Sequence, residues 1–323
     1  MKILNLKQIK SALRSVDLMP EIETGFVAYS EGRAVVPPVG ELLMQDPPGD
    51  VHIKYGYLAG DDYYVIKIAS GFYENSLLGL PSSNGLMLLF KQKTGELCSV
   101  LLDEGHLTDI RTAIAGAIAA KYLAPANVSC IGIFGTGIQA RLQLQYLKPV
   151  TDCREVAVWG RNQLKLDAYR KDMSASGFSV STTLDAAEVL QQCNLIVTTT
   201  PATKPVLTWP ADIDHGVHIT AVGSDTSHKQ ELDLATMRQA DLVVADSISQ
   251  CITRGEIHHA LQNNVIPQSD IVELGNIISG KIVGRVSDDQ VTVADLTGVA
   301  VQDIQITKAV FEAASSQGPL PQE

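Results

Sequence analysis

The chain has 323 residues, 45% of them hydrophobic, and carries a formal net charge of −11. This length and apolar content allow two compact units with sizeable cores. The acidic balance argues against a nucleic-acid-binding protein, which needs clustered Lys and Arg to neutralise phosphates. No apolar run reaches membrane-spanning length, and residues 1–20 lack the apolar stretch of a signal peptide, so we expect a cytoplasmic protein that binds no membrane.

The five cysteines include no C-x-x-C pair, and their number is odd. A disulfide framework or a zinc site is therefore not expected, and a reducing compartment fits this pattern. Cys130 and Cys193 lie in or beside apolar runs and are expected to be small buried side chains. The histidines show no spacing typical of metal ligands, so no metal is predicted.

The first third of the chain is predicted to mix helices with a sheet. Apolar residues recur at helical spacing over 9–16, and Pro20 and Gly32 bound a second helix. A long Ala-rich helix is expected over 108–122. Four short segments between these helices alternate polar and apolar residues and are separated by turn residues, which is typical of an antiparallel or mixed sheet. These segments are 51–58, 63–69, 86–91 and 98–103.

The pattern of apolar residues changes after about residue 129, where continuous apolar runs alternate with helical segments. Strands this apolar are buried on both faces, as in a parallel sheet covered by helices. The runs are 131–134, 156–159, 195–200, 218–223, 242–246 and 291–295. The pattern predicts a doubly wound α/β domain. A final helix, 299–316, follows the last strand and is expected to pack against the first part of the chain.

A glycine turn follows the first of these strands. Gly135, Gly137 and Ala140 form the pattern G-x-G-x-x-A between the strand and a helix. Gly135 allows a tight turn, Gly137 lets the backbone approach a pyrophosphate, and Ala140 lets helix and strand pack closely. The amino terminus of the helix then offers N–H groups to phosphates. An ordinary glycine turn is the alternative, but the order strand, turn and helix predicts dinucleotide binding.

The end of the second strand selects between dinucleotides. NAD sites usually carry Asp or Glu there, which accepts a hydrogen bond from the ribose 2′-hydroxyl. Here the strand is followed by Gly160, Arg161 and Asn162, so a guanidinium stands where a 2′-phosphate would bind. We therefore expect NADP(H) to be favoured, with NAD(H) possible; a solvated Arg161 without this role is the other interpretation.

Five longer stretches, taken together, carry a family resemblance. They are DIRTAIAGAIAAKYLAP (109–125), IGIFGTGIQARLQ (131–143), LIVTTTP (195–201), GVHITAVGSDTSHKQELD (216–233) and VTVADLTGVAVQD (291–303). Through them the chain resembles the ornithine cyclodeaminase/μ-crystallin family over nearly its whole length. The resemblance implies an α/β protein in which a Rossmann-type doubly wound domain, residues 116–299, is inserted into an α+β domain. That second domain, residues 1–115 completed by the C-terminal helix 300–323, would bind substrate and form a homodimer.

The resemblance also implies roles for individual residues. Lys67, Arg111 and Asp225 match residues that act in catalysis. From the resemblance and from the residues themselves, the residues expected to bind substrate are Lys67, Arg111, His52, Lys54, Thr297 and Gly298, of which His52 and Lys54 depart from the family pattern. The residues expected to bind the cofactor are Ser82, Arg111, Thr112, Gly135, Thr136, Gly137, Ile138, Gln139, Arg161, Asn162, Thr199, Thr200, Val222, Gly223, Ser224 and Lys229.

The three catalytic candidates also have structural alternatives. Asp225 follows an apolar strand at the end where ligands bind in open α/β sheets, so it could exchange a proton with a substrate nitrogen or cap the next helix. Lys67 lies in an apolar strand, where an ammonium is costly unless it is paired or extends to solvent. Arg111 suits a substrate carboxylate, or could pair with Asp109 or Glu104.

Two departures from the family pattern bear on the substrate. Relatives often carry a basic residue just after a Pro-rich turn, whereas segment 36–41 has none. His52 occupies a position where the cyclodeaminases carry an acid, which weakens the case for ornithine. His52 and Lys54 point to the same face of their strand, so they either replace the missing base or form a solvated face.

The predicted function is the NADP(H)-dependent interconversion of a small α-imino acid and an α-amino acid. Asp225 would handle the proton, while Lys67 and Arg111 would hold and polarise the carboxylate and the imine. The alternatives are a cyclodeaminase that recycles bound NAD(P) and releases ammonia, an alanine dehydrogenase-like enzyme, and a non-catalytic NADPH-binding protein. A binding protein needs no proton-transfer group, so the presence of Asp225 disfavours the last alternative.

Overall fold

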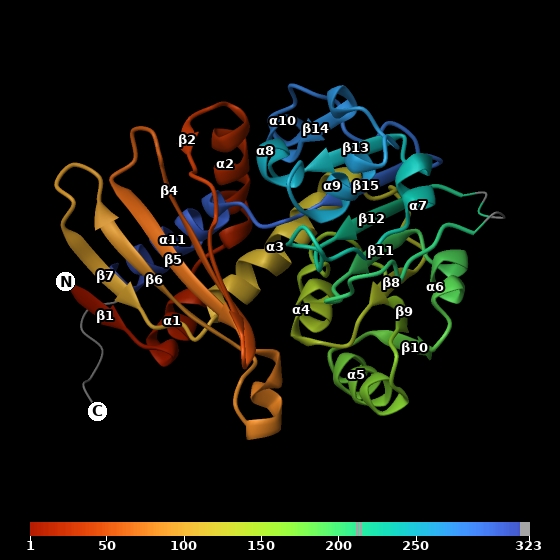
Figure 1. Ribbon diagram of the computed structural model, residues 1–323, viewed down its shortest axis with the longest axis horizontal. Coiled ribbons are helices and arrows are strands. Elements are labelled where there is room, and N and C mark those ends of the chain that lie inside the picture. The colour runs from red at the N-terminus through yellow and green to blue at the C-terminus, as the bar shows by residue number, and fades with distance from the viewer. Residues whose placement is uncertain (211–212, 214, 317–323) are drawn as a thin grey trace. The chain divides into compact units, whose positions relative to one another are not determined.

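The computed structural model describes residues 1–210, 213 and 215–316 (Figure 1). The last part of the predicted C-terminal helix, 317–323, lies outside the described residues. None of the helices in the described part is long and apolar enough to cross a membrane.

The chain divides into two compact units. Unit 1 consists of Met1–Arg111 and the segment from Val299 onward, and unit 2 consists of Thr112–Gly298. The first division falls inside a helix, α3 (His106–Leu123), which also contains the predicted boundary at residue 115. The predicted α/β fold is confirmed, because unit 2 is built on a parallel sheet with a helix after most of its strands.

Unit 1 is built on a seven-stranded sheet with the order β1-β7-β6-β5-β4-β2, in which β3 also pairs with β4. The strands are β1 (Lys2–Leu4), β2 (Ala34–Val35), β3 (Gly40–Gln45), β4 (Pro48–Leu58), β5 (Tyr63–Gly71), β6 (Ser83–Lys91) and β7 (Leu97–Leu101). The pairs are antiparallel except for β1 with β7, so the sheet is mixed, as predicted. The four predicted strands are present, and β1, β2 and β3 are additional.

The last helix of unit 1 packs on this sheet, and the first two helices pack on that helix. The helical elements of the unit are α1 (Leu6–Leu13), α2 (Leu18–Ser30), a 3-10 turn η1 (Tyr73–Leu78) and α11 (Ala300–Ser316), and the first turns of α3 also belong to unit 1. Helix α11 packs against α1, α2, β4 and β5, so the prediction that the last helix returns to the first part of the chain is confirmed. Alternate strand residues such as Val65, Met87 and Leu89 are fully buried, as the period of two requires.

Unit 2 is built on an eight-stranded parallel sheet with the order β10-β9-β8-β11-β12-β15-β13-β14. Its strands are β8 (Ile131–Phe134), β9 (Glu155–Trp159), β10 (Ser179–Thr183), β11 (Leu195–Thr198), β12 (Val217–Ala221), β13 (Leu242–Ala245), β14 (Ile271–Glu273) and β15 (Val291–Asp295). The other helices and turns are α4 (Ile138–Tyr146), α5 (Gln163–Ala175), α6 (Ala186–Gln192), α7 (Leu234–Gln239), α8 (Ile248–Cys251), α9 (Gly255–Gln262), η2 (Gln268–Asp270) and α10 (Leu274–Ile278). All six predicted strands are present, and β10 and β14 are additional.

The strand order creates a switch point beside β8. The chain runs from β8 outward to β9 and β10, then returns to the other side of β8 as β11. Because all the strands are parallel, their carboxyl ends share one edge of the sheet, and the connections beside β8 lead away in opposite directions. Ligands of open α/β sheets bind in the crevice at such an edge.

Candidate dinucleotide and substrate sites

The glycine turn lies at the carboxyl end of β8. Gly135 has a φ of +116°, and a Cβ atom there would lie 2.7 Å from Thr199 Oγ1. A Cβ on Gly137 would instead meet no heavy atom within 4 Å, so the space in front of this glycine is open. Gly137 is the N-cap of α4 and gives it no side-chain cap, which leaves the first N–H groups of the helix for a ligand.

Arg141 supports this turn and was not predicted. Its Nη1 donates to the carbonyl oxygen of Gly137 at 3.2 Å, and its Nη2 pairs with Asp172 of α5 at 2.7 Å. Because Nη1 also donates to the Thr136 carbonyl oxygen, Arg141 binds two carbonyl groups of the turn. Thr136 and Ile138 complete the turn, and Ile138 is 58% exposed. Gln139 lies within 3.5 Å of Gln143, which also donates to the Thr112 carbonyl.

Two of the predicted cofactor residues follow β9. Arg161 is exposed at the carboxyl end of this strand. The side chain of Asn162 accepts a hydrogen bond from Lys165 N at 3.1 Å and is the N-cap of α5. Asn162 therefore has a structural role that its type favours, whereas the position of Arg161 leaves its guanidinium accessible to a ligand.

A buried acid, Glu231, joins the carboxyl ends of β11 and β12. Its carboxylate accepts hydrogen bonds from Thr198 Oγ1 at 2.7 Å, Thr200 N at 2.5 Å and Gly223 N at 2.8 Å. Burial raises the pKa of Glu231, and these hydrogen bonds oppose the shift. The backbone at Thr200 and Gly223, two of the residues expected to bind the cofactor, is therefore hydrogen-bonded to one side chain. Sequence reasoning missed this role, although Glu231 lies within the stretch that carries the family resemblance.

Asp225 lies in the loop after β12, beyond Val222 and Ser224. Its Oδ1 lies 2.7 Å from Lys229 Nζ, and 39% of the Asp225 side chain is exposed. The next helix, α7, is capped by Asp233, whose Oδ1 accepts from Thr236 N at 2.7 Å. The interpretation of Asp225 as the cap of that helix is therefore wrong. Lys229 is held in place as well, because its carbonyl accepts from Ser224 Oγ at 2.6 Å.

The turn after β15 holds Thr297 and Gly298. Asp246 accepts from Gly298 N at 2.6 Å and from Thr297 Oγ1 at 3.2 Å, and Gln250 Nε2 donates to Thr297 Oγ1 at 2.8 Å. These contacts fix the turn at the same edge of the sheet as the glycine turn. The Thr297 hydroxyl therefore already forms hydrogen bonds with residues of unit 2.

Unit 1 contains a buried charge cluster around Asp303 of α11. Lys67 Nζ lies 3.4 Å from Asp303 Oδ2, and Arg111 Nε lies 3.0 Å from Asp303 Oδ1. Arg111 Nη1 also donates to Gln302 Oε1 at 3.1 Å. Lys67 is only 2% exposed, so its interpretation as a strand lysine that extends to solvent is wrong. For Arg111 the sequence offered two nearby acids, Asp109 and Glu104, and missed Asp303.

The protonation of Lys67 depends on this cluster. The pKa of Lys67 is lowered to about 7, mainly by burial and also by the charges of Arg111 and Lys54, while the charge of Asp303 opposes this shift. A lysine with such a pKa can lose or gain a proton near neutral pH. Burial raises the pKa of the nearby Asp103, and backbone hydrogen bonds and the charge of Lys67 oppose this shift.

His52 and Lys54 lie on β4, and both are buried, at 8% and 6% exposure. Their interpretation as a solvated face is therefore wrong. Lys54 is directly opposite Lys67 in the β4–β5 register, which adds a third cation to the cluster. His52 is opposite Glu41 of β3, and the distance from His52 Nε2 to Glu41 Oε1 is 3.4 Å.

Ser82 precedes β6 in an exposed segment of unit 1. Its carbonyl accepts a hydrogen bond from Phe72 N at 2.8 Å. Its expected contact with the cofactor stays a prediction.

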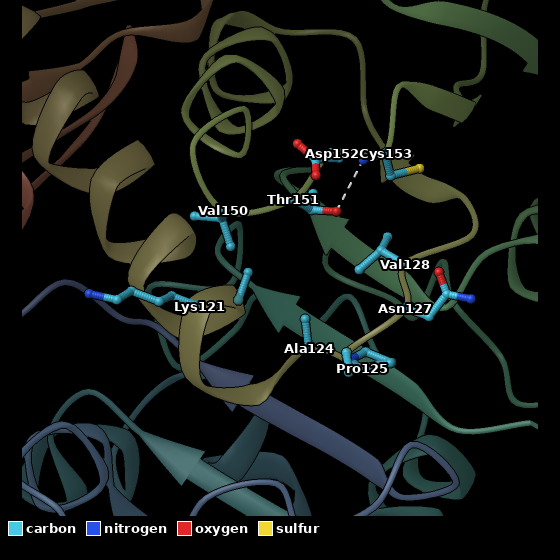
Figure 2. Close-up of a pocket in the computed structure, with 11 residues that line it drawn as sticks. Lys121, Ala124, Pro125, Asn127, Val128, Val150, Thr151, Asp152 and Cys153 are labelled. Carbon is cyan, nitrogen blue, oxygen red and sulfur yellow. Dashed lines mark hydrogen bonds between the residues drawn. The ribbon is translucent and has the colours of Figure 1, made fainter.

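A cavity of about 390 Å³ lies at the opposite edge of the unit 2 sheet (Figure 2). Its walls come from the end of α3, from the segment before β8 and from the segment before β9, and Lys121, Val128 and Cys153 are among its residues. The amino ends of the strands face this cavity, so it is separate from the glycine turn. Within the described residues, no group of three or more His, Cys, Asp or Glu side chains is arranged to hold a metal ion.

Comparison with known proteins identifies the family. A family model described as "Ornithine cyclodeaminase/mu-crystallin family" matches residues 1–318. The chain belongs to this family. The resemblance inferred from the five sequence stretches is therefore confirmed.

Individual relatives of the family match over their whole length. An uncharacterised cyclodeaminase of Sinorhizobium fredii is 40% identical, with 98% of this chain and 97% of the relative aligned. The solved structure of an archaeal alanine dehydrogenase dimer with bound NAD is 33% identical and matches with a TM-score of 0.90 over 99% of this chain and 98% of that one. The Δ1-pyrroline-2-carboxylate reductase of Thermococcus litoralis, solved with NADH and L-proline, is 27% identical and matches with a TM-score of 0.92 over both full chains.

Proposed function

We propose that this protein is a nicotinamide-dependent oxidoreductase that interconverts a small α-imino acid and an α-amino acid. The observation that carries the proposal is the buried carboxylate of Asp303, which two buried cations, Lys67 and Arg111, share. Two buried cations that share one acid favour the binding of a further negative charge where solvent is excluded, and a substrate carboxylate would supply that charge. Arg111 offers the planar fork that fits a carboxylate.

The dinucleotide is proposed to bind at the glycine turn of unit 2, where the open space at Gly137 and the uncapped start of α4 suit a pyrophosphate. When bound, it supplies or accepts the hydride. Asp225 is proposed to transfer the proton that accompanies the hydride. Its pairing with Lys229 favours the carboxylate form, which suits the oxidative direction or relay of a proton through water.

The names of the relatives support this class of reaction. The Thermococcus reductase carries a cyclic imino acid in its name and L-proline in its structure, and the archaeal enzyme is named as an alanine dehydrogenase. A cyclodeaminase is the second candidate, because a relative with 40% identity bears that name. The replacement of the family's acid by the buried His52 disfavours a substrate with a distal amine.

The cluster in unit 1 can be tested with paired substrates. NADPH oxidation is measured with Δ1-pyrroline-2-carboxylate and with Δ1-pyrroline, which lacks the carboxylate. We expect kcat/KM to be about 10- to 100-fold higher for the acid, because a charge-assisted hydrogen bond contributes roughly 1.5–3 kcal/mol. Equal values for both imines would overturn the role of the cluster in carboxylate binding.

We further propose that NADP(H) is preferred over NAD(H), because Arg161 is exposed at the end of β9 where a 2′-phosphate would bind. Titration by fluorescence should give tighter binding for NADPH than for NADH. Arg161→Ala should narrow this difference, whereas Arg170→Ala, which removes an exposed arginine of α5 paired with Asp167, should leave it unchanged. Equal affinities in the unmodified protein would exclude the preference.

A further inference from the structure

Two cysteines far apart in the sequence bring their sulfur atoms together in unit 2. The distance between Cys130 Sγ and Cys193 Sγ is 2.9 Å. Cys130 directly precedes β8, and Cys193 is the C-cap of α6, two residues before β11. These two strands are neighbours and pair in parallel, so the amino ends of both carry a thiol.

The local sequence explains why the thiols can approach. Cys130 and Gly132 point to the same face, because side chains alternate along a strand. A Cβ on Gly132 would lie 2.6 Å from Val189 Cγ1 and 3.2 Å from Cys193 Cβ. The absence of a side chain at Gly132 therefore lets the end of α6 pack directly on β8, and this packing places Cys193 over Cys130.

The two thiols differ in exposure and acidity. Cys193 is fully buried, while Cys130 is partly exposed. The hydrogen bond from Cys193 lowers the pKa of Cys130, whereas the same contact and burial raise the pKa of Cys193. A partly exposed thiol with thiolate character next to a protonated thiol is the arrangement of an oxidation-sensitive cysteine with a resolving partner.

We propose that Cys130 and Cys193 form an oxidisable dithiol, which a hydroperoxide converts into a disulfide within unit 2. In the first step the Cys130 thiolate attacks the peroxide, an S–O bond forms as the O–O bond breaks, and the leaving oxygen takes a proton to become water or an alcohol. In the second step Cys193 attacks the sulfenic acid of Cys130, an S–S bond forms as the S–O bond breaks, and water leaves with the proton of the Cys193 thiol. Two electrons pass from the thiols to the peroxide.

The structural change needed for this bond is small. A disulfide has a sulfur–sulfur distance of about 2.05 Å, so the sulfurs must approach by roughly 0.9 Å. The backbones are already in contact, because Asn194 N, next to Cys193, donates to the Cys130 carbonyl oxygen at 3.3 Å. The site lies at the amino ends of the strands, and it does not depend on the proposed function.

The full-length protein is tested with hydrogen peroxide, followed by alkylation of the remaining thiols in denaturant and peptide mass analysis. We expect a single bridged pair of peptides containing Cys130 and Cys193, a mass loss of about 2 Da, and a fall from five free thiols to three. Dithiothreitol should restore all five. Alkylation of both residues after oxidation, or a bridge between two molecules, would overturn the proposal.

Three variants make the result specific. In Cys193→Ser the sulfenic acid has no resolving thiol, so Cys130 should instead gain two oxygens, about 32 Da, as a sulfinic acid. Cys98→Ser removes a cysteine of unit 1 and should leave the bridge unchanged. Cys153→Ser removes the thiol that lines the cavity in Figure 2 and should also leave it unchanged. Loss of the bridge in Cys153→Ser would contradict the assignment of Cys193.

Discussion

At the scale of single residues, the buried pair of Lys67 and Asp303 is expected to control how KM depends on pH. Asp303 opposes the lowering of the Lys67 pKa, which is about 7. The charged form of Lys67 is lost as the pH rises through this value, and with it part of the attraction for a substrate carboxylate. We therefore expect KM of the unmodified enzyme to rise above about pH 7, while its kcat changes less.

Removal of the Asp303 charge should shift this pH dependence. In Asp303→Asn the opposing negative charge is absent, so the pKa of Lys67 falls further and the rise in KM begins at a lower pH. Breaking a buried ion pair also costs about 3–5 kcal/mol of stability, so the variant's unfolding is measured beside its kinetics. The control is Asp61→Asn, which removes the ion pair between Asp61 and Lys308, a residue of the same helix α11. This variant should leave the pH dependence of KM unchanged. If the pH dependence of KM is unchanged in Asp303→Asn, the protonation of Lys67 does not control that dependence.

Asp225 allows a second test at this scale. Asp225→Asn should retain the fold and dinucleotide binding, because α7 has its own cap in Asp233. Its kcat should fall by about 10²–10⁴, the usual contribution of a positioned acid or base. Fluorescence titration with NADPH and turnover are measured on the same sample. A variant that binds NADPH normally and turns over at the original rate would exclude Asp225 from proton transfer.

The sequence identified Lys67, Arg111 and Asp225 as candidates, but it did not identify the residues that position them. Asp303 and Glu231 lie in the matching stretches, yet nothing in their local pattern shows that both are buried, that Asp303 pairs with two cations or that Glu231 accepts hydrogen bonds from other elements. In the sequence Arg141 is an ordinary helix residue, and only the structure shows that it donates to the Gly137 carbonyl oxygen. Such roles depend on contacts that bring together separate elements, which spacing along the chain does not reveal.

At the scale of elements, the two glycines of the turn should respond differently to the same substitution. Gly137→Ala places a methyl group in open space, so the melting temperature should change little while NADPH affinity falls at least about tenfold, because the methyl blocks the backbone approach to the pyrophosphate. Gly135→Ala forces a side chain into a left-handed conformation and against Thr199, so it should also lower the melting temperature. Unchanged NADPH binding in Gly137→Ala would place the phosphates elsewhere.

Three of the strands that sequence reasoning missed, β1, β10 and β14, lack the pattern that predicts a strand. β10 reads Ser-Val-Ser-Thr-Thr and lies at the edge of its sheet, where burial does not impose an apolar run. β1 and β14 have three residues each, too few for a periodic pattern. The central strands β8, β11 and β12 were predicted because both of their faces are buried, so that most of their residues are apolar.

At the scale of the whole molecule, we expect a homodimer formed through unit 1. The sheet face away from the fully buried residues carries Tyr55, Ile66 and Leu88 in one cross-strand row, and Tyr55 is 37% exposed. Tyr64 and Phe90 stack on the same sheet with ring centroids 4.8 Å apart. A contiguous apolar face of this kind favours association about a two-fold axis.

Sedimentation at micromolar concentration should therefore show a dimer. Tyr55→Asp should shift it toward monomer, because a charge would be buried in the interface. The control is Leu164→Asp, at a position of α5 that is 80% exposed, and this variant should remain a dimer. A monomer in the unmodified protein would exclude this interface.

The central claim is net transfer of a hydride between the dinucleotide and a small α-imino or α-amino acid. The most direct measurement follows nicotinamide absorbance and ammonia in the same sample, with NADPH and Δ1-pyrroline-2-carboxylate in one series and NAD(P)⁺ with ornithine or lysine in another. We predict that NADPH is oxidised in proportion to the imine consumed and that no ammonia is released in the first series. Release of ammonia from a diamino acid without net change in the nicotinamide, and no turnover of the imine, would contradict this account and establish a cyclodeaminase.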